Sequence, residues 1–298
     1  MLFSHFRVGC HSRNRAFHPK GGPVPELPEV QTIVNDLIGT GIVGQKIIDV
    51  SVFWPATIAM PSQSDFVRQL RGQPINAVYR RGKFIVFQLT GPRILAVHLR
   101  MTGRFFLAEG RALRLPHVHV VMTLCGGRIL CFHDTRKFGR FYLIDDPEQF
   151  LGALGSEPLS RGFTAQKLAD ALAGRKRQIK PLLLDQTFIA GLGNIYVDEA
   201  LWAARIHPLR RSDALTMPEV RDLHAAIRRV LRQGLKNRGT TLGTGQGNFA
   251  SLGTARGANA RLLKVFRRTG QPCHRCGQAV ERIIVGQRST HLCKGCQI

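Results

Sequence analysis

The sequence Pro25-Glu26-Leu27-Pro28-Glu29-Val30 is the stretch around which the chain is organised. Proline suits the first turn of a helix because its missing N–H would have no partner there. Apolar residues then recur at helical spacing, so the stretch predicts the start of an amphipathic helix. These residues are Val30, Ile33, Val34, Leu37 and Ile38. Taken alone, the hexapeptide is equally compatible with a turn that has no chemical role.

The same stretch carries the parts of a covalent catalyst. A proline at a free N-terminus is a secondary amine with a pKa of roughly 8, so part of it is neutral near neutral pH. Such an amine can attack an electrophilic carbon and form an iminium, while Glu26 transfers protons. Inside a chain the nitrogen of Pro25 is an amide nitrogen and is unreactive. This interpretation therefore requires Pro25 to be the first residue.

Residues 1–24 contain four basic residues and no acidic one, and they lack the apolar core of a secretory signal. They admit three interpretations: an organelle transit peptide, a disordered basic arm, or a segment that is absent from the mature protein. We expect the last, because Val24 can correspond to a GUG start codon whose methionine is trimmed to expose Pro25.

The composition bounds the class of protein. The 298 residues are 44% hydrophobic and 7% aromatic, which is enough for two domains and a small third unit. The net charge of +24 and the pI of about 11.1 indicate a polyanionic partner, with nucleic acid as the first candidate. No apolar run approaches the roughly 20 residues that a membrane span needs, and no basic amphipathic helix carries a bulky apolar face. Seven cysteines without a secretory signal do not indicate a disulfide framework.

The first half of the chain, residues 25–155, is predicted to be rich in β-structure. Short runs of Val, Ile and Phe with partial alternation are broken by Gly and Pro, which is typical of a sandwich. The runs that predict strands are 46–53, 84–89, 94–99, 117–124 and 141–144. The polar segments 80–83, 98–103 and 133–139 lie between them, and each is individually compatible with a solvated hairpin turn.

The second half, residues 156–260, is predicted to be helical. The expected helices are 164–173, 180–188, 194–204 and 217–235. Gly191 and Gly193 permit a tight turn before the third helix, whose first N–H groups could hold a phosphate; an ordinary corner between helices is the alternative. The Gly-, Thr- and Asn-rich segment 239–260 is long for a plain connection and is predicted to be a lid or a linker.

The C-terminal segment, residues 261–298, has eight Lys or Arg residues and a single acid, Glu281. Its cysteines follow the spacing C-x2-C-x16-C-x2-C, which predicts a tetrahedral four-thiolate zinc site. The ligands would be Cys273, Cys276, Cys293 and Cys296. Residues 280–291 between the pairs read as two short strands, so a zinc-stapled hairpin is expected; two disulfides are the alternative.

These pieces, in this order, resemble the bacterial type of the formamidopyrimidine-DNA glycosylase family of base-excision repair enzymes. The resemblance covers about residues 25–298, and it depends on the hexapeptide, the segment Gly193-Asn194-Ile195-Tyr196 and the four-cysteine hairpin. Leu27 separates the chain from the related endonuclease VIII branch, which usually has Gly at that position.

The resemblance implies an α+β, multidomain fold with a β-sandwich, a helix–two-turns–helix domain and a C-terminal zinc-finger β-hairpin. DNA would lie in the cleft between the domains. The implied reaction excises an oxidised purine and then nicks the strand by β,δ-elimination, with one structural zinc ion and no redox cofactor. The implied partner is double-stranded DNA containing oxidised bases, bound by a monomer in the bacterial cytoplasm at the nucleoid, with no membrane involved.

The resemblance also implies catalytic roles for four residues. Pro25 corresponds to the nucleophile at C1′ of the sugar, and Glu26 to the acid that helps to open the ribose ring. Lys83 corresponds to a lysine at the lesion phosphate or base. Arg288, near the expected hairpin tip, corresponds to a group that grips a backbone phosphate.

Further positions correspond to residues that bind DNA. Met101, Arg136 and Phe138 match the trio that fills the gap left by a flipped base and wedges the duplex. His98 and Asn194 match groups on backbone phosphates, and Glu29 is expected to organise the site. The remaining implied positions are His117, Lys180, Tyr196 and, where a lesion-capping loop begins, Thr240 and Thr241.

The chain departs from the family pattern at two places besides its start. Arg100 precedes the wedge Met101 where Gly is common, and it could add a phosphate contact. Phe266 and Arg267 occupy a turn where Tyr and Gly are expected, which concerns packing rather than chemistry.

Two other functions stay open on the sequence alone. One is an oxidised-pyrimidine glycosylase of the endonuclease VIII branch. The other is a non-catalytic zinc-finger protein that senses lesions, which would follow if Pro25 is truly internal.

Overall fold

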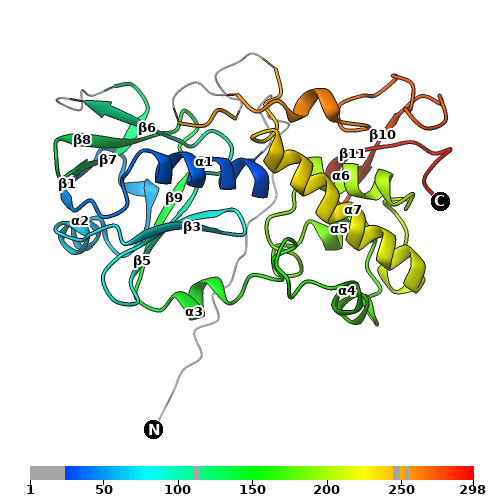
Figure 1. Ribbon diagram of the computed structural model, residues 1–298, viewed down its shortest axis with the longest axis horizontal. Coiled ribbons are helices and arrows are strands. Elements are labelled where there is room, and N and C mark those ends of the chain that lie inside the picture. Colours follow the sequence, from blue (N-terminus) through cyan, green and yellow to red (C-terminus); the bar gives the residue numbers. More distant parts are fainter. Residues whose placement is uncertain (1–23, 110–114, 244–248, 253–255) are drawn as a thin grey trace, which may run out of the picture.

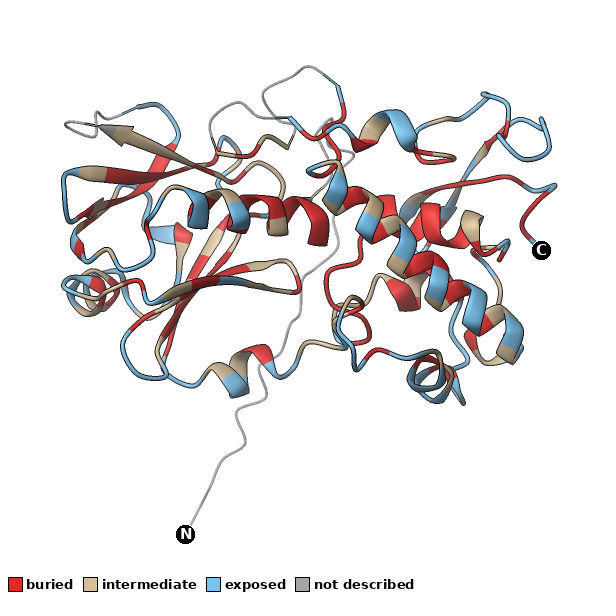
Figure 2. Ribbon diagram, in the orientation of Figure 1, coloured by how far each residue is buried: buried red, intermediate tan, exposed pale blue. Residues whose placement is uncertain are grey.

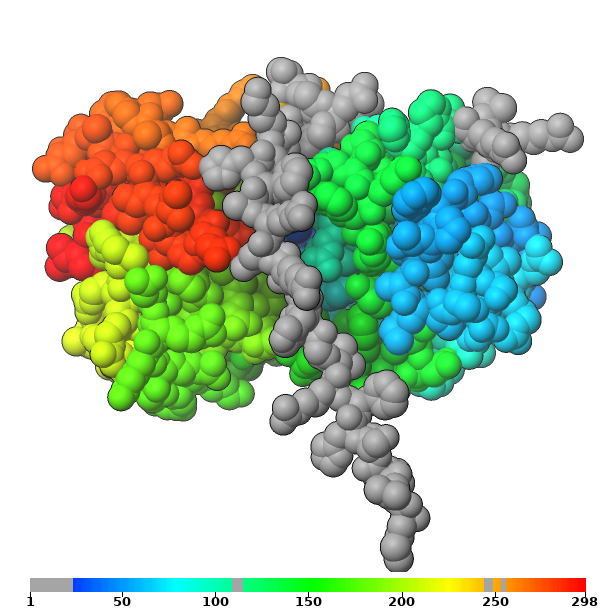
Figure 3. Space-filling model, turned by 180° about the vertical axis from the view of Figure 1, so that it is seen from behind, coloured from blue at the N-terminus to red at the C-terminus, as the bar shows by residue number. Residues whose placement is uncertain are grey.

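The structure is a computed structural model that describes residues 24–109, 115–243, 249–252 and 256–298. The expectations for residues 1–23, and for parts of the predicted lid, lie outside this range. A β-rich half and a helical half lie side by side, and helix α1 (Leu27–Gly39) reaches from one to the other (Figure 1). Seen from behind, the β-rich half and the helical half again lie side by side (Figure 3).

The β-rich half consists of two sheets packed around one core. The first sheet is antiparallel in the order β1-β7-β8-β6, and the second has the order β2-β9-β5-β4-β3, in which only β2 and β9 run parallel. Side chains from both sheets, such as Phe105, Phe132 and Phe141, share one buried cluster. The predicted β-sandwich is therefore confirmed. The first sheet contains β1 (Ile47–Val52), β6 (Arg104–Glu109), β7 (Val118–Leu124) and β8 (Arg128–His133). The second contains β2 (Ile58–Met60), β3 (Ala77–Arg81), β4 (Phe84–Gln88), β5 (Ile94–His98) and β9 (Arg140–Ile144).

All five strands named from the sequence are present, within one or two residues of the predicted bounds. Strands β2, β3, β6 and β8 were not predicted, nor was helix α2 (Gln63–Leu70). Strand β3 was missed because its last two residues, Arg80 and Arg81, resemble a polar turn. They continue the strand because they pair with Ile85 and Phe84 of β4, and both arginines also bind Glu157.

Helix α1 owes its position to its two-sided apolar surface. Leu27 at its start belongs to the core of the helical half, whereas Val30, Ile33 and Leu37 belong to the core of the sandwich. In Figure 2 the first turn of α1, next to the helical half, is coloured as buried. The helix therefore fixes its first turn, which carries the hexapeptide, at the junction of the two halves.

The helical half packs around a core of aliphatic side chains from α4 (Ala165–Leu172), α5 (Ile179–Leu183), α6 (Asn194–Ala203) and α7 (Met217–Lys236). Thr216 and Glu219 form a capping box at the start of α7, as its sequence favours. The helix expected over 180–188 is shorter than predicted: α5 ends at Leu183, and turns follow. A short helix α3 (Pro147–Leu151) and the turns η1 (Pro55–Thr57) and η2 (Ser212–Ala214) complete the connections.

The C-terminal segment forms the expected hairpin. After η3 (Asn259–Leu262), strands β10 (Glu281–Val285) and β11 (Arg288–Leu292) pair antiparallel beside α6. Arg267, which replaces an expected Gly, has φ +58°, so the backbone there adopts the left-handed region that favours glycine. The departure noted in the sequence therefore falls at a position where glycine has a conformational advantage.

Candidate active site and nucleic-acid interface

Glu26 lies at the N-terminus of α6, although the two are 167 residues apart in the chain. Its Oε2 accepts hydrogen bonds from the backbone N–H of Gly193 (2.8 Å) and Tyr196 (3.3 Å), and its Oε1 from that of Ile195 (2.8 Å). The first N–H groups of α6 thus hold this carboxyl group, where the sequence suggested a phosphate. A side chain at Gly193 would overlap the Glu26 carboxyl, since its Cβ would lie 2.4 Å from Cδ. Glycine is therefore required there by close approach.

Burial raises the pKa of Glu26 from its ordinary value, although the positive charge of Lys83 and the three backbone N–H groups oppose this rise. The side chain is 1% exposed. A carboxyl group with a raised pKa keeps a proton more readily at neutral pH, which suits a general acid. Pro25, also buried, directly precedes it.

Glu29 forms a second buried carboxyl site one helical turn further along α1. Its Oε2 accepts the backbone N–H of Glu26 (3.0 Å), and its Oε1 accepts both the Tyr196 hydroxyl (2.8 Å) and the Thr240 N–H (2.7 Å). Burial, followed by the negative charge of Glu26, raises the pKa of Glu29 to about 7. The pair therefore holds two carboxyl groups that disfavour simultaneous ionisation.

Lys83 is placed by the β3–β4 turn. Glu157, from the segment between the domains, accepts the N–H of Gly82 (2.7 Å) and binds Arg80 and Arg81. Burial lowers the pKa of Lys83, and the positive charge of Arg288 lowers it further, while Glu26 and Glu29 oppose the shift. Lys83 therefore lies within electrostatic range of Glu26, Glu29 and Arg288.

The predicted wedge trio comes together on two neighbouring loops. Arg136 Nη1 lies 3.1 Å from Met101 Sδ, and the Arg136 guanidinium lies 4.7 Å from the ring centroid of Phe138. Phe138 is 44% exposed, which is high for a large apolar side chain. An exposed aromatic side chain beside an arginine is suited to insertion into a base stack.

Asp134, which the sequence analysis did not single out, holds the wedge loops. Its fully buried carboxylate accepts the N–H groups of Arg136 (3.1 Å), Phe138 (2.8 Å) and Gly139 (2.7 Å). It also accepts the hydroxyl of Thr102 from the Met101 loop. One carboxylate thus sets the relative position of both loops.

His98 and His117 lie at strand ends near these loops. His98 Nδ1 accepts the N–H of Arg100 (3.0 Å), and burial with the charges of Arg100 and Lys83 lowers the pKa of His98 to about 3. The ring is therefore neutral and carries its proton on Nε2, which can donate to an anion. His117 is exposed at φ +65°, and Arg100, where Gly is common in the family, has φ +54°.

Several residues that the resemblance placed on DNA are internal in the structure. Lys180 is 0% exposed, Tyr196 1%, Thr240 2% and Glu29 2%. Thr241 is buried as well, and its hydroxyl donates to the carbonyl of residue 249 and accepts from the N–H of residue 257, at the base of the predicted lid. These side chains are occupied by protein partners, so they can influence DNA only through the groups that they hold. Asn194 and Arg288 differ, being half-buried and exposed respectively.

The four cysteines form a metal-binding group. Their Sγ atoms all lie within 4.8 Å of one another, with Cys273–Cys296 at 3.9 Å and Cys276–Cys293 at 3.4 Å. These separations are too long for disulfides and suit four thiolates around one tetrahedral zinc ion. Trp202 Nε1 and the N–H of Arg275 donate to Cys273 Sγ, as expected for groups that orient a zinc ligand.

Apart from Asp134 and Glu157, the sequence analysis missed Asp198 and Glu199 on α6. Asp198 is fully buried, and Glu199 accepts the N–H groups of residues 264, 265 and 266. Two adjacent acids on one helix gave no signal because acids on a helix are usually solvated. The backbone N–H groups that Asp198 and Glu199 bind lie more than 60 residues away in the sequence, so local spacing could not predict these contacts.

The fold and the site define a zinc-finger protein with a proline, two buried carboxyl groups and a lysine at the junction of two domains. Three family models match the chain in order: the formamidopyrimidine-DNA glycosylase N-terminal domain at 24–141, the H2TH domain of the same enzymes at 154–245, and a zinc finger found in FPG and IleRS at 270–298. The chain belongs to the formamidopyrimidine-DNA glycosylase family.

Curated relatives extend this match along most of the chain. The formamidopyrimidine-DNA glycosylase of Protochlamydia amoebophila (strain UWE25) is 49% identical over 274 residues, which cover 92% of this chain and 99% of that protein. The formamidopyrimidine-DNA glycosylase of Moorella thermoacetica is 47% identical over 264 residues, which cover 87% of this chain and 94% of that protein.

Solved structures of the Lactococcus lactis enzyme are similar as well. Its complex with DNA containing an abasic site has a TM-score of 0.83 at 36% identity and covers 91% of this chain and 99% of that one. Complexes of the wild-type enzyme with N7-benzyl-Fapy-dG DNA and with oxidised-pyrimidine DNA have TM-scores of 0.82 at 36% identity, each covering 92% and 99%. Among the described residues, none of the helices combines the length and apolarity required to traverse a bilayer.

Proposed function

We propose that the protein excises oxidised purines, such as 8-oxoguanine and formamidopyrimidines, from duplex DNA and then cleaves the abasic strand by β,δ-elimination. The observation that carries this proposal is the Glu26 carboxyl group, buried at the N-terminus of α6 directly after Pro25. It provides a proton donor beside the only residue of the hexapeptide that can become an amine nucleophile. We further propose that the protein acts as a monomer at the nucleoid, in the cytoplasm.

In this mechanism the reactive chain begins at Pro25. Its amine attacks C1′ as the bond to the base breaks, and Glu26 protonates O4′ so that the sugar ring opens to an iminium. Loss of a proton from C2′ then expels the 3′ phosphate, and a second elimination expels the 5′ phosphate. Lys83, whose pKa is lowered by burial, is proposed to act on the lesion or its phosphate.

The target base must leave the stack before this chemistry can start, at a cost of a few kcal/mol. Met101, Arg136 and Phe138 are proposed to fill the vacated space, with Arg136 pairing with the orphaned base. His98, Asn194 and Arg288 are proposed to bind phosphates around the lesion, with His117 contributing from the strand end. Glu29, Tyr196, Thr240 and Thr241 would support the site from within. The zinc ion, held by the four cysteines, would supply structure to the hairpin that carries Arg288.

Activity on oxidised pyrimidines is the second candidate. It is favoured by the Lactococcus lactis complex with oxidised-pyrimidine DNA, from a protein 36% identical to this chain. Excision rates on 8-oxoguanine and thymine-glycol duplexes separate the two candidates, and we expect the faster rate on 8-oxoguanine.

The deciding experiment measures the intact mass of the protein from its native host and then traps it with borohydride on an 8-oxoguanine duplex. A chain that begins at Pro25 and becomes covalently attached to DNA is the expected result. A longer chain that binds abasic-analogue DNA but neither traps nor cuts would overturn the proposal and leave a lesion-binding protein. A longer chain that still traps would move the nucleophile to another amine, with Lys83 as the first candidate.

A further inference from the structure

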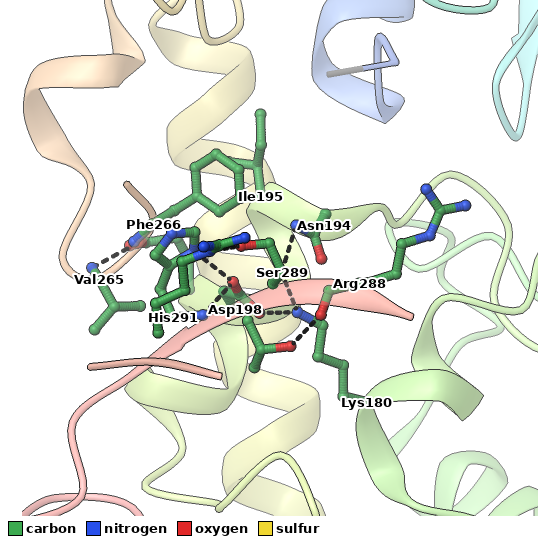
Figure 4. A network of polar contacts seen from close by, with 12 residues as sticks. Lys180, Asn194, Ile195, Asp198, Val265, Phe266, Arg288, Ser289 and His291 are labelled. Atoms are coloured by element: carbon green, nitrogen blue, oxygen red, sulfur yellow. Dashed lines mark hydrogen bonds and ion pairs between the residues drawn. The ribbon is translucent and has the colours of Figure 1, made fainter. Parts of the chain in front are cut away.

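A buried ion pair lies where the zinc-finger hairpin meets the helical half. Lys180 Nζ on α5 is 2.5 Å from Asp198 Oδ1 on α6, and both side chains are 0% exposed. The second oxygen of Asp198 accepts the backbone N–H of His291 on β11 at 2.9 Å and lies 3.2 Å from His291 Nδ1. Two consecutive helices and a strand 93 residues beyond Asp198 thus converge on one carboxylate (Figure 4).

The same pair holds the hairpin one residue from Arg288. The carbonyl of Ser289 accepts hydrogen bonds from Lys180 Nζ (3.0 Å) and Asn194 Nδ2 (2.8 Å). At the hairpin tip, a Cβ on Gly286 would lie 2.9 Å from Cγ of Pro181, so the backbone packs directly on α5. In Figure 4 the Arg288 side chain extends from the end of β11, away from Asp198 and past Asn194.

Helix α6 connects this junction to the active site. Its first turn binds the Glu26 carboxyl, Asn194 binds Ser289, and Asp198 follows one turn later. Glu199 binds three successive N–H groups of the segment that leads into the zinc finger. A single rigid helix therefore carries the contacts of both Glu26 and the strand of Arg288.

The buried pair is better suited to fixing geometry than to contacting DNA or adding stability. Direct DNA contact is excluded in this arrangement, because neither side chain is exposed and every polar end has a protein partner. Stability alone accounts poorly for the pair, since a buried ion pair is often no more stabilising than well-packed apolar side chains. What such a pair provides is a defined geometry, here of β11 relative to α5 and α6.

We propose that Lys180 and Asp198 are a positioning pair, which fixes the register of β11 so that Arg288 meets a phosphate of a DNA strand whose lesion lies at Glu26. This inference rests on the proposed function and adds two residues that act on DNA only through Arg288. It also changes the role of Lys180 from a DNA contact to a support of the contact.

The test uses the full-length double variant Lys180→Met with Asp198→Asn. It leaves the net charge unchanged and leaves no unpaired charge buried, and the amide oxygen of Asn can still accept the N–H of His291. We expect weaker binding to an abasic-analogue duplex by about tenfold, and a log–log salt slope that is smaller by up to about 0.9, as for one lost phosphate contact. A lower folded fraction alone would reduce active protein equally at every salt concentration and leave the slope unchanged.

Arg288→Ala completes a double-mutant cycle. Because the pair acts through Arg288, adding both substitutions to Arg288→Ala should weaken binding no further. Losses that simply add, or a double variant with the affinity and slope of the wild type, would overturn the inference. If the double variant loses its zinc, Lys180→Gln with Asp198→Asn provides the same comparison, because it also preserves net charge and allows a hydrogen bond between the two amide side chains.

The matched control is an exposed ion pair of the same zinc finger, in which Lys294 Nζ lies 2.7 Å from Glu281 Oε2. The side chains of Glu281 and Lys294 are 42% and 61% exposed. Glu281→Gln with Lys294→Met also preserves net charge and should leave affinity and slope unchanged. A wild-type protein that fails to prefer the abasic analogue over undamaged duplex would instead contradict the proposed function. The two failures are therefore distinguishable.

Discussion

Glu26 and Glu29 are the residues whose chemistry depends most on burial. Each carboxyl group accepts three hydrogen bonds, which favour the ionised form, yet removal from water raises both pKa values, and the negative charge of Glu26 raises that of Glu29 further. The two groups share one site and are linked by the N–H of Glu26. Their protonation states are therefore coupled.

Glu26→Gln should separate the two chemical steps. An amide cannot protonate O4′, so we expect base excision from 8-oxoguanine to slow by at least about 100-fold, while incision of a preformed abasic site stays within about tenfold. Single-turnover kinetics on both duplexes measure this difference. Borohydride trapping on the abasic duplex counts the competent molecules, so loss of folded protein cannot imitate the effect. Excision at the wild-type rate would contradict the acid role.

Glu29 should make stability depend on pH in a defined direction. Its folded pKa of about 7 lies above its ordinary value, so the folded state binds the proton more tightly. The resulting stabilisation is complete below the unfolded pKa and is lost as pH rises through about 7, and its full size is on the order of 3 kcal/mol. Denaturant unfolding of wild type and Glu29→Gln between about pH 4 and pH 8 measures it.

The comparison with Glu29→Gln is needed because His98 and His133, with lowered pKa values, change stability in the opposite direction as pH falls. Both histidines are present in each protein, so their contributions cancel in the difference. A difference in unfolding free energy that stays constant with pH would show that folding does not change the pKa of Glu29.

Helix α6 is the element on which the site depends. It holds Glu26 at its N-terminus and holds the zinc-finger segment through Asp198, Glu199 and Trp202. Its sequence signal, two glycines before an apolar helix, is compatible with an ordinary corner. The contacts that give it a role come from α1, α5 and the hairpin.

Gly193→Ala should displace the Glu26 side chain without straining the backbone at position 193. Gly193 has φ −141°, which any residue adopts, but its Cβ would lie 2.4 Å from Cδ of Glu26. We expect excision to slow by at least about tenfold because Glu26 must move. Gly39→Ala is the matched control, since nothing lies within 4 Å of its Cβ and α1 would tolerate it. Equal excision rates in the two variants would contradict the argument.

At the scale of the molecule, charge and shape act together. The whole chain has a net charge of +24, and Arg288 and Lys83 are contributed from different halves of the described structure. A polyanion bound between them releases counterions in proportion to the phosphates contacted. Binding should therefore depend steeply on salt.

With about six phosphates contacted, the log–log slope of affinity against salt should be near −5. Fluorescence anisotropy on an abasic-analogue duplex and on undamaged duplex, from about 50 to 300 mM salt, measures both slopes. A slope shallower than about −2 would mean that most of the basic surface faces away from DNA.

Sequence spacing alone determined the elements whose partners are local. The amphipathic start of α1, the capping box of α7 and the four-cysteine hairpin each depend on residues within a few positions of one another. Composition likewise indicated a polyanionic partner, and the order of motifs indicated the family. Short apolar runs beside arginines, such as β6 and β8, were missed because their pairing is decided by neighbouring strands.

Only the tertiary structure decided which polar residues act inside the protein. Glu26 binds α6 from 167 residues away, and Lys180, expected on DNA, is buried against Asp198 and the hairpin. Asp134 and Glu157 hold loops from positions that look like solvated acids in the sequence. A carboxylate or ammonium group is buried only where enough donors or acceptors converge on it, and that convergence depends on the packing of distant segments.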